Sequence, residues 1–78
     1  MILEYELDYR SSSQIYEKIF LRTLRKSGLR GKIVREDFCL KLYIESENIA
    51  ELEEFATLFA DALPGSIFLY DIKASIID

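Results

Sequence analysis

Hydrophobic and polar residues alternate along four stretches of the chain, as expected of β-strands that bury one face. The stretches are residues 2–9, 29–35, 38–45 and 66–77. The third alternates most regularly, and we expect its even-numbered residues to face the core. Its two sets are Phe38, Leu40, Leu42 and Ile44 on the inner face, and Cys39, Lys41, Tyr43 and Glu45 on the outer face. Glu36-Asp37 is predicted to form the tight turn that precedes this strand.

Two further stretches repeat their hydrophobic residues every three or four positions, which predicts amphipathic helices. The first follows the serines at 11–13 and ends before Gly28; the second follows Asn48 and ends before Pro64-Gly65. The predicted buried stripes are Ile15, Tyr16, Ile19, Phe20, Thr23 and Leu24, then Leu52, Phe55, Ala56, Phe59, Ala60 and Leu63. Ser11 with Gln14, and Asn48 with Glu51, have the spacing of capping boxes.

The order strand, helix, strand, strand, helix, strand predicts a single α+β domain over residues 1–78. This β-α-β-β-α-β order is that of the split β-α-β, or ferredoxin-like, sandwich. Two amphipathic helices need one shared apolar surface, so both are expected on one face of a four-stranded antiparallel sheet. The right-handed crossover rule favours the sheet order 4-1-3-2.

The open face of such a sheet is predicted to carry opposite charges on neighbouring strands. Glu4, Glu6 and Asp8 would lie between Lys41 on one side and the Asp71/Lys73 pair on the other. Opposite charges facing each other across strands stabilise a sheet by about 0.2–1 kcal/mol per pair. One interpretation is a solvated, salt-bridged surface. The other is a docking surface, because Tyr43 and Leu69 are expected on the same face.

Composition narrows the possible functions. Ten Lys and Arg against fourteen Asp and Glu give a net charge of −4, which disfavours nucleic acid as a partner. The chain has no His, the commonest general base and metal ligand. Its single cysteine, Cys39, is expected to be a small, partly buried side chain in a reducing cytoplasm. Because no apolar stretch is long enough to span a bilayer, we expect a cytoplasmic domain that does not bind a membrane. We also expect no cofactor.

The candidate anion-binding site is the segment before the first helix, formed by Arg10, Ser11, Ser12 and Ser13. Backbone N–H groups at a helix N-terminus attract phosphate and carboxylate groups, and Arg10 would add a positive charge. The other interpretation is that the serines only cap the helix.

Two groups of charged residues lie near helix ends. The basic group is Arg22, Arg25, Lys26, Arg30 and Lys32, and the acidic group is Glu51, Glu53 and Glu54. The basic group would suit an acidic partner, although cations at a helix C-terminus also balance the helix dipole. No complementary ligands are spaced to turn the acidic group into a metal site.

Three segments of the chain resemble acylphosphatases: residues 28–35, 40–45 and 50–55. They are similar to the Gly-hydrophobic-x-Gly-x-Val segment, the alternating strand and the Glu-rich helix of that family. Leu63-Pro64-Gly65-Ser66 leading to Asp71-Ile72 also resembles its last crossover. The resemblance implies the same fold and the hydrolysis of small acyl phosphates. It further implies an Arg after the first strand that holds the phosphate, and an Asn on the second strand that orients the attacking water.

Both of those family positions are replaced in this chain. The Arg position matches Glu17, whose charge would repel a phosphate, and the Asn position matches Arg35. The resemblance therefore implies an acylphosphatase-like domain with a degenerate site, in which Arg10 is the remaining catalytic candidate.

Similar domains stand at the N-terminus of the hydrogenase maturation carbamoyltransferases, which use carbamoyl phosphate. We expect this chain to be such a module, with other domains of a longer chain or a separate protein as its partner. One alternative is a stand-alone ferredoxin-like module that binds proteins through its sheet face or strand edge. The other is an active acyl-phosphate hydrolase that uses Arg10.

Overall fold

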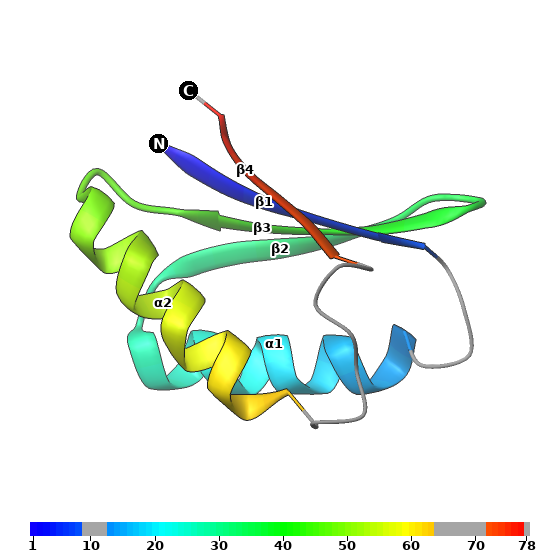
Figure 1. Cartoon of the computed structure of the whole chain (residues 1–78), viewed down its shortest axis with the longest axis horizontal. Helices are drawn as coiled ribbons and strands as arrows, with labels where there is room; N and C mark the ends of the chain where they lie inside the picture. Colours follow the sequence, from blue (N-terminus) through cyan, green and yellow to red (C-terminus); the bar gives the residue numbers. More distant parts are fainter. Residues whose placement is uncertain (9–12, 64–71, 78) are drawn as a thin grey trace.

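The computed structural model describes residues 1–8, 13–63 and 72–77, and Figure 1 shows their arrangement. Within these residues the elements follow the predicted order: β1 Ile2–Asp8, α1 Ser13–Ser27, β2 Arg30–Arg35, β3 Cys39–Glu45, α2 Ile49–Ala62 and β4 Ile72–Ile77. All strand pairs are antiparallel. The sheet order is β2-β3-β1-β4, which is the predicted order 4-1-3-2 read from the other edge. Both helices lie on one face of the sheet, so the predicted α+β fold is confirmed.

The hydrophobic core lies between this inner face of the sheet and the two helices. The central strands supply its floor with Leu3, Tyr5, Leu7, Leu40, Leu42 and Ile44, all buried. Phe20 of α1 packs edge-to-face against Phe55 and Phe59 of α2, at ring-centroid distances of 5.7 and 6.0 Å. The ring of Tyr5 lies 4.9 Å from that of Phe59. These aromatic contacts hold both helices against β1, and large buried rings dominate the packing of a domain this small.

Capping explains where the helices begin and end. Gly28 follows α1 with a φ of +70°, a left-handed conformation that glycine adopts without strain. Asn48 caps α2, because its side-chain oxygen accepts from the Ala50 N–H at 2.9 Å. The reciprocal half of the predicted box is wrong: the Glu51 carboxylate accepts from the Ser46 hydroxyl at 2.9 Å, and that same hydroxyl accepts from the Asn48 N–H.

The prediction that Phe38 faces the core is wrong, since this side chain is 86% exposed. The backbone N–H of Glu36 donates to the Cys39 carbonyl at 2.9 Å, and Arg35 pairs with Leu40. Asp37 and Phe38 therefore form the hairpin loop, one residue later than predicted. Phe38 continues the alternation of β3 in sequence, but its backbone has left the strand.

Four other residues expected on the core side are exposed: Ile15 and Ala60 of the helix stripes, and Ala74 and Ile76, which the alternation of the last strand places on one face with Ile72. Ile15 and Ala60 each neighbour a buried aromatic residue, Tyr16 and Phe59, and one helical position turns a side chain by about 100°. Ile76 lies at the end of the edge strand β4. Of the predicted strand ends, Tyr9 and residues 66–71 lie outside the described residues. Neither helix that the structure describes is long and apolar enough to cross a membrane.

Candidate functional site

The predicted anion-binding segment is described only at its end. Arg10, Ser11 and Ser12 lie outside the described residues, and Ser13 is the first residue of α1. Anion binding at this segment therefore stays a prediction.

The two positions that the acylphosphatase resemblance marks as replaced, Glu17 and Arg35, form an ion pair. Nε of Arg35 lies 2.8 Å from Oε1 of Glu17, and Nη2 donates to Oε2 at 3.2 Å. Oε1 is buried and accepts no hydrogen bond within the described residues, although the Arg35 Nε lies 2.8 Å away. The two-atom contact fixes both side chains across the space between α1 and β2.

The environment of this pair follows from the fold. Arg35 is the last residue of β2, where its register places it on the helix-covered side of the sheet, and Glu17 lies in the second turn of α1. The Glu17 side chain is only 15% exposed, whereas that of Arg35 is 59% exposed. A nearly buried carboxylate needs a cation beside it. The guanidinium charge of Arg35 is therefore used within the protein, close to where the resemblance would place a phosphate.

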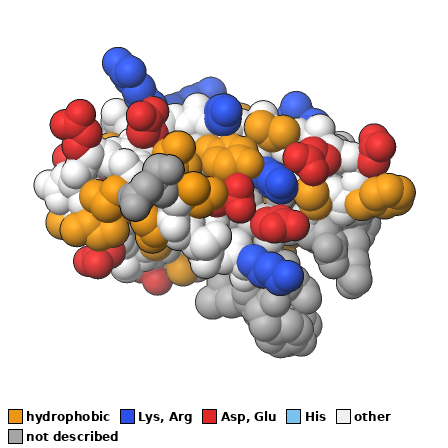
Figure 2. Space-filling model, turned by 90° about the horizontal axis from the view of Figure 1, so that it is seen from above, with side chains coloured by type: hydrophobic (Ala, Val, Ile, Leu, Met, Phe, Trp, Pro, Cys, Tyr) orange, Lys and Arg blue, Asp and Glu red, His pale blue; other side chains and the backbone are white. Residues whose placement is uncertain are grey.

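The opposite, helix-free face of the sheet carries charged rows that cross the strands. Glu6 lies in register between Lys41 and Lys73, which confirms the predicted alternation of charge for these three residues. The next row runs from Ser75 through Glu4 to Tyr43, and then to Lys32 on β2. Figure 2 shows this face, with hydrophobic side chains in the middle and acidic and basic ones around and among them.

Three side chains on this face, those of Cys39, Lys41 and Tyr43, have a pKa above the ordinary value, so each holds its proton more tightly. Partial burial, reinforced by the Glu36 carboxylate 3.4 Å away, raises the pKa of the Cys39 thiol. Glu36 also lies 3.4 Å from the Lys41 ammonium and raises the pKa of Lys41. Burial and the Glu4 carboxylate raise the pKa of Tyr43. A thiol that stays protonated is a poor nucleophile, so Cys39 is not suited to covalent catalysis.

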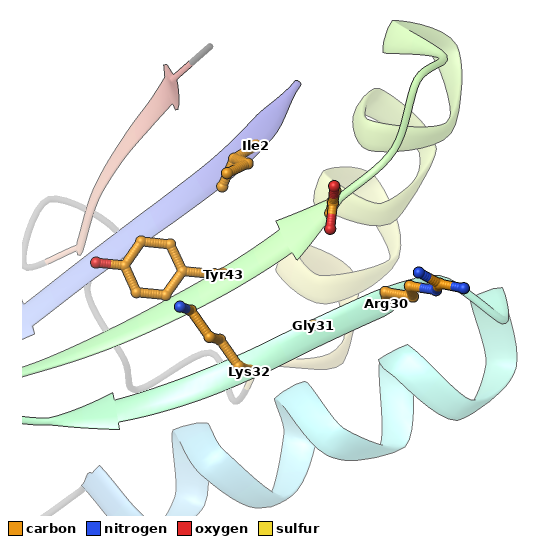
Figure 3. Close-up of a pocket in the computed structure, with 6 residues that line it drawn as sticks. Ile2, Arg30, Gly31, Lys32 and Tyr43 are labelled. Carbon is orange, nitrogen blue, oxygen red and sulfur yellow. The ribbon is translucent and has the colours of Figure 1, made fainter.

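A shallow hollow of about 390 Å³ opens on the same face, above the start of β2 and the end of β3. Its lining residues are Ile2, Arg30, Gly31, Lys32, Tyr43 and Glu45. Figure 3 shows the Lys32 side chain reaching toward Tyr43, and its ammonium lies 5.2 Å from the ring centroid. A cation over an aromatic face is attracted to it by about 0.5–1 kcal/mol at an exposed site. The hollow combines an apolar floor with two cations from one strand.

Metal-holding clusters are missing from the described part of the chain. Nowhere in it do three His, Cys, Asp or Glu side chains gather to hold a metal ion. The protein-family models and the curated proteins contain no match to this chain. The structure does provide a charged, partly aromatic sheet face and the hollow beside β2.

Sequence reasoning found both members of the Glu17–Arg35 pair but not their contact. Each was noted as an unsuitable replacement at a family position, 18 positions apart in the chain. The opposite charges of the two replacements were a signal that they could compensate each other. The hollow was missed, because its walls come from three strands and become neighbours only through the register of the sheet.

Proposed function

We propose that this chain is a non-catalytic, acylphosphatase-like docking domain. The observation that carries the proposal is the ion pair between Glu17 and Arg35. At the positions where the resemblance expects a phosphate-holding Arg and a water-orienting Asn, two side chains neutralise each other. An acyl-phosphate hydrolase depends on positive charge directed at the phosphoryl group, and here that charge faces a carboxylate.

A binding role is supported by what the domain leaves exposed. The outer sheet face presents Tyr43, Lys32 and the hollow beside them, and the edge strand β2 carries three exposed basic residues. Domains without chemistry of their own act through such surfaces.

Hydrolysis of acetyl phosphate and carbamoyl phosphate tests the non-catalytic part of the proposal. The folded wild-type chain should hydrolyse neither faster than buffer does. Turnover that disappears in the Arg10→Ala variant would contradict the proposal and favour the active hydrolase. Arg22→Ala, a change of the same type in the middle of α1, is the matched control.

We further propose that the domain is the N-terminal module of a hydrogenase maturation carbamoyltransferase that uses carbamoyl phosphate. This assignment is supported only by the resemblance of residues 28–35, 40–45 and 50–55. Reading the gene beyond the codon for Asp78 tests it. Cysteine pairs with zinc-finger spacing would support it. A stop codon would favour the stand-alone interaction module, which the exposed sheet face and the β2 edge also support.

A further inference from the structure

The basic residues of this acidic chain are concentrated in one segment. Seven of the ten Lys and Arg residues fall between positions 18 and 35, which contain no Asp or Glu. This segment forms most of α1 and all of β2. The rest of the chain has three basic and fourteen acidic residues. All charged residues of α2 are acidic. The side of the domain built by α1 and β2 is therefore basic, although the whole chain carries a net negative charge.

Within this basic side, β2 has an open backbone edge. It is paired with β3 on one side only, at the end of the sheet order. The bond from the Glu36 N–H to the Cys39 carbonyl sets the alternation of an antiparallel ladder. By this alternation the even-numbered residues of β2 bond to β3, whereas Gly31 and Ile33 turn their N–H and C=O groups outward. Over the described ranges, no other element donates to or accepts from these two backbones.

The outer-face wall of this edge is cationic. Arg30 and Lys32 stand two residues apart on β2, border the hollow and are exposed (Figure 3). Neither forms a salt bridge with a carboxylate among the residues that the structure describes. Glu45 is the register partner of Arg30 on β3 and also lines the hollow.

The helix-side wall of the edge is apolar. Leu24 of α1 lies directly under Gly31, and Glu17 reaches Arg35, so one side of α1 runs along β2 in the opposite direction. Leu21 lies on that same side, four residues after Glu17 and three before Leu24. Leu21 is 44% exposed, so the helix side of this edge presents an apolar side chain to solvent.

We propose that β2 binds an extended acidic segment of a partner protein, which adds to the sheet as a further strand. A strand paired with Gly31 and Ile33 would place alternate side chains on the two walls. Acidic residues would face Arg30 and Lys32, and hydrophobic residues would face Leu21. The bound segment is therefore one in which acidic and hydrophobic residues alternate.

Charge and shape favour a protein strand over a nucleic acid. The outward N–H and C=O groups occur in pairs, at the spacing with which the backbone of an added strand pairs. The basic wall is two residues long and is bounded by Glu45, Glu36 and Asp37, which repel a continuous phosphate backbone. The same two cations keep neutral strands from adding to the edge, so they act as a filter for acidic ones.

This inference deepens the docking role proposed above and rests on it. The two fail separately. Acyl-phosphate turnover would remove the non-catalytic assignment and leave strand binding to be measured. If no acidic strand binds to β2, the partner proposed in this subsection is wrong, and the non-catalytic assignment is unaffected.

The test uses the ¹⁵N-labelled chain at low salt and a blocked eight-residue peptide that alternates valine and glutamate. At saturation, amide hydrogen exchange at Gly31 and Ile33 should slow by at least tenfold, because these N–H groups gain acceptors. The Lys32 amide, already bonded to β3, should keep its rate. A peptide that alternates valine and lysine should leave all three amides unchanged.

Two charge-reversal variants test whether peptide binding depends on the basic residues of β2 or only on the net charge of the domain. Lys32→Glu should weaken binding of the valine–glutamate peptide by about tenfold, because one attraction becomes a repulsion. Lys73→Glu, an exposed change on the opposite edge strand β4, should leave it unchanged; amide spectra of both variants verify the fold.

Four results would overturn the proposal. They are unchanged exchange at Gly31 and Ile33, slowed exchange along β4 instead, equal binding of both peptides, and slowed exchange without peptide that grows with protein concentration. The last result would identify a second copy of the chain as the occupant. A single-stranded oligouridylate that shifts the Arg30 and Lys32 amides when the acidic peptide does not would also overturn it, in favour of nucleic acid.

Discussion

Glu17 on α1 and Arg35 on β2 are joined by two contacts of 2.8 and 3.2 Å, which tie the start of the first helix to the end of the second strand. The carboxylate is nearly buried and the guanidinium is half exposed, so the pair is asymmetric. Removing the exposed cation leaves a buried anion behind, whereas neutralising the anion leaves a cation that water can solvate.

This asymmetry predicts unequal effects on stability. Arg35→Ala should lower the free energy of unfolding by about 1–3 kcal/mol, because it strands the carboxylate. Glu17→Gln should cost less, and the double variant should cost less than the sum of the two. Urea unfolding of the four proteins measures the coupling, expected at about 1 kcal/mol. Strictly additive effects would show that the two side chains do not stabilise each other.

Two glycines provide a matched test of the packing of β2. A Cβ at Gly31 would lie 2.6 Å from the Tyr43 carbonyl oxygen and 2.9 Å from both terminal methyl groups of Leu24. At Gly28 it would meet nothing within 4 Å, and only the φ of +70° opposes it. Gly28→Ala should therefore cost about 1 kcal/mol, and Gly31→Ala more, about 1–3 kcal/mol. Equal losses in urea unfolding would mean that β2 and α1 are not this closely packed.

Two phenylalanines, Phe59 and Phe38, test which positions belong to the hydrophobic core. Phe59 is 1% exposed and contacts three aromatic rings, whereas Phe38 is 86% exposed in the hairpin loop. Phe59→Ala should cost about 3–5 kcal/mol and leave a domain this small largely unfolded. Phe59→Leu, with a smaller loss, keeps the comparison measurable. Phe38→Ala should change stability by less than about 0.5 kcal/mol, and a large loss there would place Phe38 in a contact that the fold does not contain.

The raised pKa of the buried Tyr5 hydroxyl predicts that the folded protein loses stability at alkaline pH. Burial raises the pKa of Tyr5 to about 12 from its ordinary value of 10. The folded state therefore holds this proton more tightly than the unfolded state does. Its contribution is complete below pH 10 and is lost between pH 10 and 12, by about 2–3 kcal/mol. Tyr5→Phe should flatten the pH dependence of unfolding over this range. An unchanged slope in Tyr5→Phe would contradict the assigned burial.

The architecture was predictable because it depends on local periodicity, and each element of this chain carries its own period. Features set by only one or two residues were less accessible. Phe38 fits the alternation of β3, and only the bond between Glu36 and Cys39 shows that it belongs to the loop. Glu51 has the spacing of a capping partner, but the Ser46 hydroxyl competes for it.

The candidate site depended on long-range geometry. Periodicity carries no information about which charges meet across the core, so the contact between Glu17 and Arg35 had to come from the fold. The basic segment between residues 18 and 35 was visible in part as a cluster at the helix end. Its alignment with an open strand edge followed only from the sheet order.

Titration of the ¹⁵N-labelled chain with inorganic phosphate tests the central claim most directly, since that claim is an internally neutralised anion position. We expect the amide resonances of Glu17 and Arg35 to stay in place at high phosphate concentration, apart from the uniform drift caused by ionic strength. Saturable shifts confined to those resonances would contradict the account, because they would show that the position still holds a phosphate.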